Sequence, residues 1–299
     1  MKPIIVMATL VAGAALSSTA NSKDLNKTGS NPQRQTSSGE VYTAINETLS
    51  DSLQRLKEGA ESGNTDAQWQ YGVALIRGYA GRTPNKPEGA RWIRLAASAG
   101  NPIAQTALGH LYLIGEGVPL DYQEAHTWTS RAALQGHVPA QTRLASMFRD
   151  GIGTETNRAE QLKWLEEAAR QGDSESQYLA AMQLLLGDGV QKDIRKAIHW
   201  LNLATTQGNA NAQATLASLY FKGAEVPANR GEALRLAELS AAQNNAMGMQ
   251  TLAIILLTDK DKEPDIDRAK SLLRRSAILL REDPEALIDK VMRITGHRQ

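Results

Sequence analysis

The chain contains no cysteine among its 299 residues. This absence excludes disulfides, thiol catalysis, Cys-based metal sites and a lipid-bearing cysteine behind a leader. Aromatic residues make up only 5% of the chain, so a core must be built mainly from Ala, Leu and Ile. The 33 basic and 32 acidic residues nearly cancel. A balanced chain lacks the basic surface that binding to nucleic acid or anionic lipid requires.

Catalytic and metal-binding motifs are also missing. The sequence holds no G-x-S-x-G, no Ser followed three residues later by Lys, and no H-E-x-x-H. The histidines are scattered, and we interpret each as a surface or inter-helix residue: His110, His126, His137, His199 and His297. We therefore predict a protein that is not an enzyme and that has no cofactor, no metal and no catalytic residue.

The N-terminus resembles an export signal. Lys2 precedes an uncharged, mostly apolar run over residues 3–16, and the small residues Ser18, Thr19 and Ala20 follow it. This pattern predicts a signal peptide over residues 1–20 with cleavage after Ala20, and so a periplasmic or secreted protein. The alternative is a membrane anchor, but a spanning helix needs roughly 20 apolar residues. No later run is that long, so we expect no membrane span after cleavage.

Residues 21–39 are rich in Ser, Thr, Asn, Gln and Gly and show no apolar periodicity. Such a segment cannot bury enough apolar surface to offset the entropy lost on ordering. We predict a flexible linker here and a folded region over residues 40–299.

The folded region is an array of repeats. Tryptophans recur every 36 residues, and the same register continues with leucine: Trp92, Trp128, Trp164, Trp200, Leu236 and Leu272. Glutamines recur at steps of 36 or 37: Gln68, Gln105, Gln141, Gln177, Gln213 and Gln250. In most repeats a glycine lies five residues before the glutamine and another ten residues after it. Independent columns with one period indicate a solenoid.

Each period predicts two helices. In the second repeat, Asn101 and Pro102 suit the start of a helix that runs to about Ile114, where glycine breaks it. Asp121 followed by Glu124 predicts a capping box that begins the second helix. We interpret the tryptophans as a core column rather than a ligand-stacking ladder, because leucine replaces them at both ends, at Leu56 before Trp92 and at Leu236 after Trp200. Small residues at one mid-helix position predict close helix packing there: Gly72, Gly109, Ala145, Ala181 and Ala217.

These motifs identify a family. The run Ala104-Gln105-x-x-Leu108-Gly109-x-x-Tyr112-x-x-Gly115-x-Gly117, followed by Asp121 to Trp128, resembles the Sel1-like repeat family, which is related to tetratricopeptide repeats. The resemblance implies an all-α, right-handed α/α superhelical solenoid with capping helices. The expected parts are a capping helix over 40–62, repeats over about 63–99, 100–135, 136–171, 172–207 and 208–244, a degenerate sixth over 245–281, and a C-terminal helix over 283–295. In the sixth repeat we place Asn245, Ile254 and Lys260 at the positions of the first glycine, the small residue and the second glycine.

The family also implies partner binding on the first helix of each pair, which lines the concave surface in related tetratricopeptide repeats. The residues one, five and eight positions after each glutamine form one stripe there. With the neighbouring arginine of the first repeat, the predicted partner-binding residues are Trp69, Val73, Ile76, Arg77, Thr106, His110, Leu113, Thr142, Ser146, Arg149, Tyr178, Met182, Leu185, Ser218 and Phe221; Ala214 shares the stripe. We expect the large apolar members to be exposed anchors and the two arginines to pair with acidic groups. The alternative is that some of them pack against a neighbouring helix.

The leading prediction is a non-enzymatic, periplasmic or secreted scaffold or regulator that holds a segment of another protein in a concave groove. One alternative is an envelope enzyme that acts on peptidoglycan or a β-lactam. One branch of the family with reported β-lactam-directed activity carries a disulfide in each repeat, and this chain has no cysteine for it. The other alternative is a structural spacer that associates with itself as a homo-oligomer.

Overall fold

A computed structural model describes residues 49–78, 82–259 and 263–297, and divides the chain into a unit of residues 1–55 and a unit of residues 56–299. The predicted signal peptide and linker, and residues 40–48 of the predicted capping helix, lie outside the described residues. Residues 49–61 are helical. All the elements discussed below belong to the second unit.

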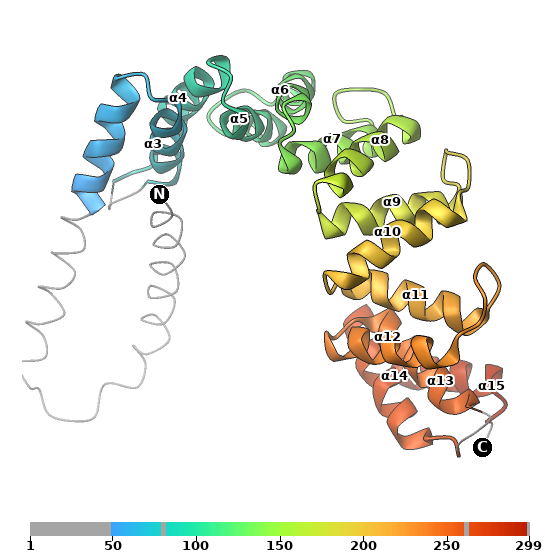
Figure 1. The fold of residues 1–299 in the computed structure, drawn as a ribbon. Helices are drawn as coiled ribbons and strands as arrows, with labels where there is room; N and C mark the ends of the chain where they lie inside the picture. The colour runs from blue at the N-terminus through green and yellow to red at the C-terminus, as the bar shows by residue number, and fades with distance from the viewer. Residues whose placement is uncertain (1–48, 79–81, 260–262, 298–299) are drawn as a thin grey trace, which may run out of the picture. The chain divides into compact units, whose positions relative to one another are not determined.

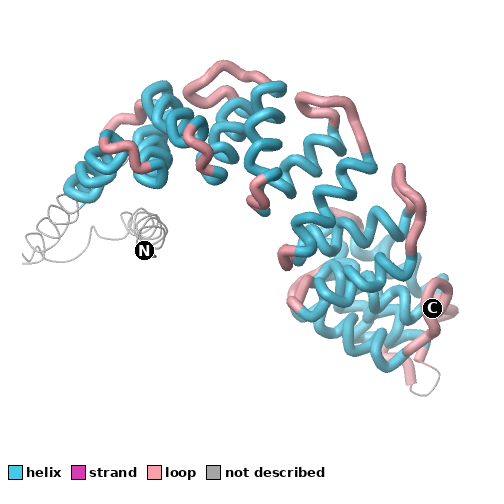
Figure 2. Tube along the Cα trace, turned by 45° about the horizontal axis from the view of Figure 1, so that its top comes forward, coloured by secondary structure: helices cyan, strands magenta, loops and turns pink. Residues whose placement is uncertain are grey.

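The second unit is built from helices in sequential pairs, and each helix packs against the next one in the chain (Figure 1). Longer loops join the two helices of a pair, and short turns join one pair to the next (Figure 2). The fold is therefore the predicted all-α repeat solenoid. The helices are α3 Thr65–Arg77, α4 Lys86–Ser98, α5 Pro102–Ile114, α6 Tyr122–Leu134, α7 Val138–Asp150, α8 Arg158–Arg170, α9 Ser174–Leu186, α10 Ile194–Thr206, α11 Ala210–Lys222, α12 Arg230–Ala242, α13 Ala246–Thr258, α14 Ile266–Leu280 and α15 Pro284–Ile294.

The predicted caps determine where the helices begin and end. Asp121 accepts hydrogen bonds from the backbone N–H groups of Gln123 and Glu124, both at 3.0 Å, and so caps α6. The other half of the predicted capping box does not form, because the N–H of Asp121 donates to the carbonyl of Tyr112 at 3.0 Å. Gly115 ends α5 in the left-handed conformation, with φ of 68°.

The tryptophan column is buried, which confirms that it belongs to the core. In α6 the glutamate of the predicted box serves this column, because the indole N–H of Trp128 donates to Glu124 at 2.9 Å. Trp200 has Lys196 at that position instead, and its buried indole N–H has no partner among the described residues. The box glutamate therefore satisfies a core tryptophan rather than the start of the helix.

The mid-helix column of small residues also marks close packing, as predicted. A Cβ atom at Gly72 of α3 would lie 2.6 Å from the backbone oxygen of Gly89 in α4. A Cβ atom at Gly109 of α5 would lie 2.6 Å from the hydroxyl of Thr129 in α6. Only a hydrogen atom fits at these two crossings.

The column glutamines Gln105, Gln141 and Gln177 each join their own repeat to the preceding one. The buried Gln141 in α7 donates from Nε2 to the carbonyl of Ala133 in α6 at 3.2 Å. Its Oε1 accepts a hydrogen bond from Nε2 of Gln171, at the end of α8, at 2.8 Å. The same two bonds occur at Gln105 and Gln177. The buried amides are thus satisfied by a second column of glutamines, at the C-caps of the second helices.

Replacing Gln141 with methionine is expected to lower the free energy of unfolding by about 1–3 kcal/mol, because Gln171 loses its acceptor and Ala133 one of its donors. Methionine fits the site by size, since Met249 occupies the equivalent position in α13. Urea unfolding followed by circular dichroism measures the loss. The control is a double-mutant cycle with Gln171→Ala, which should cost less in the Gln141→Met background than in the native chain. Additive losses would contradict the bridge.

The sixth repeat differs from the prediction by one residue. Asn245 caps α13 as Asn209 caps α11, and Asn244 adopts the left-handed conformation with φ of 59°. The 36-residue period therefore continues, and the column positions fall on Met249 and Ala253, both fully buried, instead of Gln250 and Ile254. Our register was wrong because Gln250 imitates the column one residue too late. Asp259 stands at the position of the second glycine and ends α13, and Lys260 lies outside the described residues.

Candidate functional site

The first helix of every pair exposes one stripe of residues. The core-facing column glutamine marks the opposite side, and the residues two before it and two, five and nine after it are exposed or half-buried in α3, α5, α7, α9 and α11, except for the buried Thr215 of α11. At about 100° per residue these four positions fall within about 60° of one another around the helix. We call them the exposed stripe. In α3, α5, α7, α9 and α11 it comprises Asp66, Gln70, Val73, Arg77, Ile103, Ala107, His110, Ile114, Pro139, Arg143, Ser146, Asp150, Glu175, Leu179, Met182, Leu186, Asn211, Thr215, Ser218 and Lys222.

The predicted partner-binding residues lie beside this stripe and share only part of it. Their large apolar members are half-buried rather than exposed, which corrects our expectation for Trp69, Tyr178, Met182 and Phe221. Trp69, Val73 and Ile76 pack against the core formed by α4 to α6, and Tyr178, Leu185 and Phe221 pack against the core of the later repeats. Leu113 is also half-buried, and Ala214 is fully buried.

Many of the predicted partner-binding residues are buried or half-buried because two of the predicted positions point toward a neighbouring repeat. The residues one and eight after the glutamine face the following repeat. Thr106 is buried there, with its hydroxyl 2.7 Å from Nδ1 of His137 at the start of the next repeat. The hydroxyl of Tyr178 likewise pairs with Thr215 of the next first helix, although burial raises the pKa of Tyr178.

The polar predicted residues fall into two groups. Thr142 and Ser146 donate to carbonyls of their own helix, and Arg149 forms a two-pronged ion pair with the adjacent Asp150 at 2.8 Å. Arg77 and His110 are exposed, and neither has a hydrogen-bond or ion-pair partner among the described residues. Ser218 is half-buried on α11. Arg149 is thus engaged within the chain, whereas Arg77 has no such partner among the residues that the structure describes.

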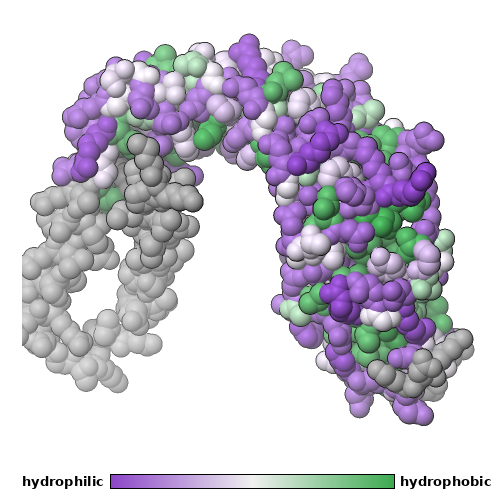
Figure 3. All heavy atoms as spheres, in the orientation of Figure 1, coloured by the Kyte–Doolittle hydropathy of each residue, from purple (hydrophilic) through white to green (hydrophobic). Residues whose placement is uncertain are grey.

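Sequence reasoning missed the apolar residues that the stripe does expose. Leu186 is 70% exposed and Ile114 is 52% exposed. Ile103, Leu179 and Met247 occupy other positions of the stripe and are exposed as well. Figure 3 shows apolar side chains in separate patches between polar ones over α9 to α12. The helical period measured from the buried glutamine was the signal that could have found these residues.

A polar bridge between repeats involves the first position of the stripe in α3 and α9. The N-cap asparagine of a repeat reaches back to the first residue of the preceding stripe: Asn101 donates to Asp66 at 2.8 Å, and Asn209 donates to Glu175 at 3.1 Å. Ile103 and Pro139 hold that stripe position in α5 and α7 and have no acceptor to offer. Their side chains are exposed, so the middle of the array presents apolar surface.

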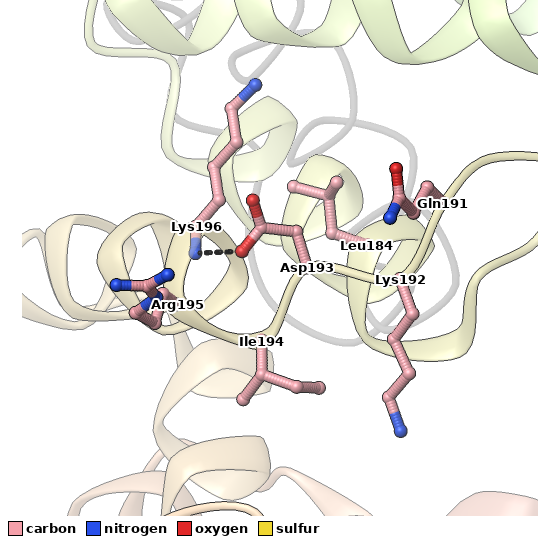
Figure 4. Close-up of a pocket in the computed structure, with 7 residues that line it drawn as sticks. All are labelled: Leu184, Gln191, Lys192, Asp193, Ile194, Arg195 and Lys196. Atoms are coloured by element: carbon pink, nitrogen blue, oxygen red, sulfur yellow. Dashed lines mark hydrogen bonds between the residues drawn. The ribbon is translucent and has the colours of Figure 1, made fainter.

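The pocket in Figure 4 lies where the loop after α9 enters α10 and has a volume of about 460 Å³. Asp193 caps α10 by accepting from the N–H of Lys196 at 3.0 Å. Two lysines that line the pocket already form ion pairs with other repeats: Lys192 with Glu225 at 2.8 Å and Lys196 with Glu166 at 2.6 Å. The two lysines of the pocket therefore hold neighbouring repeats together.

Three histidines titrate below their ordinary range. Burial lowers the pKa of His110, His126 and His137, and the charge of Arg143 lowers that of His110 further while Glu116 opposes the shift. His126 packs edge-on against Phe148, with ring centroids 5.4 Å apart. No group of three or more His, Cys, Asp or Glu that could hold a metal occurs within the described part of the chain.

Acidification is expected to destabilise the folded chain through these histidines. Because their pKa values are lower in the folded state, the unfolded chain binds more protons as the pH falls below about 6.5. Stability is therefore present above that pH and declines as the pH falls toward the folded-state values. Thermal unfolding between pH 8 and 5 measures this decline, and His126→Gln should make it shallower. A variant with the same pH slope as the native chain would rule out a contribution from His126.

The helix pairs thus form an α/α repeat solenoid. The first helix of each pair carries a stripe that contains both apolar and polar residues. The Sel1 repeat model matches residues 65–101, 102–137, 138–173, 174–209, 210–245 and 247–279. The chain therefore belongs to the Sel1 repeat family. No helix within the described ranges combines the length and apolar character needed to cross a membrane.

Solved structures show the same fold. A protective antigen of uropathogenic Escherichia coli strains with an SLR fold is 29% identical, with a TM-score of 0.70 over 82% of this chain. The match spans 56% of the antigen's chain, a little over half its length. A Sel1 repeat protein from Oxalobacter formigenes is 24% identical, with a TM-score of 0.61 over 76% of this chain and 99% of that one. No match was found among curated protein sequences.

Proposed function

We propose that this chain is a non-catalytic scaffold that holds a partner protein on the exposed stripe of its first helices. The observation that carries the proposal is the set of exposed aliphatic side chains on the stripe of α5 and α9, Ile103, Ile114, Leu179 and Leu186, of which Ile114 and Leu186 share one stripe position. Exposed apolar surface of this kind marks protein interfaces. Membership of a repeat-scaffold family supports the same function, since stacked repeats create extended binding surfaces.

Site-specific crosslinking tests this function with a matched pair of positions. A photoreactive amino acid replaces Leu179 on the stripe in one variant and Leu203 on the second helix α10 in the other; both leucines are 37% exposed. In cells of the source organism, we expect a discrete protein adduct from position 179 and none from position 203. Adducts from position 203 alone would move binding to the second helices. Adducts from neither position would overturn the proposal.

The site of action is part of the same proposal. The sequence pattern of residues 1–20 supports export to the periplasm or the medium. Mass spectrometry of the protein recovered from cell fractions tests it. We expect a chain that begins at Asn21 outside the cytoplasm, and an uncleaved cytoplasmic chain would contradict it.

A further inference from the structure

The charges on the exposed stripe are engaged unequally. Its acidic residues all have partners within the chain: Asp66 accepts from Asn101, Asp150 pairs with Arg149, and Glu175 accepts from Asn209. Three basic residues of the stripe, Arg77, Arg143 and Lys222, form neither a hydrogen bond nor an ion pair within the described ranges. The stripe's cations are therefore its charged side chains without a partner among the described residues, while Asp66 and Glu175 keep their negative charge because their donors are neutral amides.

Arg143 is the unusual member of this set. It lies in the middle of α7 and is half-buried, whereas Arg77 and Lys222 are exposed in the last turns of α3 and α11. A cation in the last turn of a helix is stabilised by the helix dipole and by water. Burial instead lowers the pKa of Arg143, although its guanidinium remains charged at neutral pH. Removing a charge from water without a partner is unfavourable, so Arg143 has more to gain from an external acid than the other two.

The surroundings of Arg143 are largely aliphatic, apart from His110 on α5, whose pKa the charge of Arg143 lowers. The same stripe position holds Ala107 in the preceding first helix and Leu179 in the following one. The exposed Ile103 and Ile114 lie on α5, and the exposed Leu186 lies on α9. A single cation is thus bordered by aliphatic surface on the helices before and after it.

We propose that the partner segment held by this chain carries an aspartate or glutamate that pairs with Arg143, with aliphatic side chains on both sides of that acid. The inference rests on the proposed function and specifies the chemistry of the partner. A carboxylate can receive two parallel hydrogen bonds from a guanidinium, which gives both strength and register. The flanking aliphatic groups cover the exposed parts of α5 and α9.

Other anionic partners fit this surface less well. Nucleic acid and anionic membranes are bound by several cations spread along a groove or face. Here the free cations are separated by whole repeats, and the residues between them on the stripe are largely aliphatic or paired. A peptide with one acid among apolar residues matches that spacing of charge and apolar surface.

Selection from a random peptide library tests the inference while the natural partner is still unidentified. Phage-displayed 12-residue peptides are selected on protein purified after expression of the full-length chain. We expect the enriched peptides to share an Asp or Glu flanked by Leu, Ile, Val or Met. A synthetic peptide with that motif should bind Arg143→Gln at least about tenfold more weakly, the loss expected for a charge-assisted contact. Enriched peptides without a shared acid would overturn the inference.

Two matched variants separate pairing from general effects. Arg195→Gln removes an exposed arginine of the second helix α10 that has no ion-pair partner within the described ranges, and it should change the affinity less than twofold. Arg143→Glu should abolish binding of the acidic peptide and restore binding when the peptide acid is changed to lysine. Equal losses in Arg143→Gln and Arg195→Gln would show a mere net-charge effect and overturn the pairing.

A stability measurement guards against misfolding of the variants. Because Arg143 has no partner within the described chain, Arg143→Gln should leave the midpoint of thermal unfolding unchanged or raise it. A lower midpoint would assign Arg143 a structural role and contradict the inference. Crosslinking at position 179 that persists with unchanged yield in the Arg143→Gln variant would leave the scaffold intact and reject only the acidic contact. Absence of crosslinking at position 179 in the chain that keeps Arg143 would reject the proposed scaffold function itself.

Discussion

Replacing Trp128 with alanine is expected to lower the free energy of unfolding by about 3–5 kcal/mol, the usual cost of emptying a buried aromatic site. Trp128 is buried in the core that α4, α5 and α6 share. Its indole N–H donates to Glu124, and the guanidinium of Arg131 lies 4.4 Å from the centre of its ring. The substitution therefore removes packing, a hydrogen bond and a cation–π contact together.

Urea unfolding monitored by circular dichroism measures this loss. Thr127→Ala is the control, because Thr127 is the exposed neighbour in the same helix and its truncation should change stability by less than about 0.5 kcal/mol. A loss below about 1 kcal/mol for Trp128→Ala would contradict the core assignment of the tryptophan column. It would instead favour the ligand-stacking interpretation of that column.

Replacing Gly153 with alanine is expected to lower the free energy of unfolding by about 2–5 kcal/mol for two separate reasons. Gly153 has a φ of 67°, a conformation that costs an L-residue roughly 1–2 kcal/mol. A Cβ atom there would also collide with the backbone oxygen of Tyr122, at the start of α6 in the preceding repeat, and overpacking adds about 1–3 kcal/mol. The loop before α8 would have to move away from the preceding repeat.

Gly172→Ala separates the two contributions. Gly172 also has a positive φ, 92°, but a Cβ atom there would meet no atom within 4 Å. We expect Gly172→Ala to lose only the free energy of unfolding that comes from placing an L-residue at positive φ. The difference between the two variants therefore measures the contact between repeats. Equal losses in thermal or urea unfolding would show that the loop of Gly153 does not bear on the preceding repeat.

The fold could be predicted from the sequence because each diagnostic feature recurs in several repeats. Tryptophan, glycine and cap positions recur with one period, so a single ambiguous residue does not change the interpretation. The sixth repeat shows the limit: Gln250 stood next to the true position, and only the caps at Asn244 and Asn245 reveal the register. Column identity depends on backbone geometry, which residue type alone does not report.

The candidate site was predicted less well, for a different reason. The first helices were identified correctly, but which side of a helix faces its neighbour depends on how the pairs are rotated against each other. That rotation buries Thr106 and leaves Ile114 and Leu186 exposed. Arg143 was not singled out, because a charged residue in a helix is ordinarily solvated. Its significance comes only from the absence of a partner among the described residues.

The glutamine bridges have a direction that bears on how the protein is made. Gln141 bonds backward to Ala133 and is met by Gln171, and both partners precede the end of its own repeat in the chain. Each bridged repeat can therefore satisfy its buried amides as soon as it has emerged from the ribosome, without waiting for the next one. During synthesis from the N-terminus, ordered repeats would be added one by one to the last repeat that has already folded. Each folded repeat would then provide the surface against which the next repeat packs.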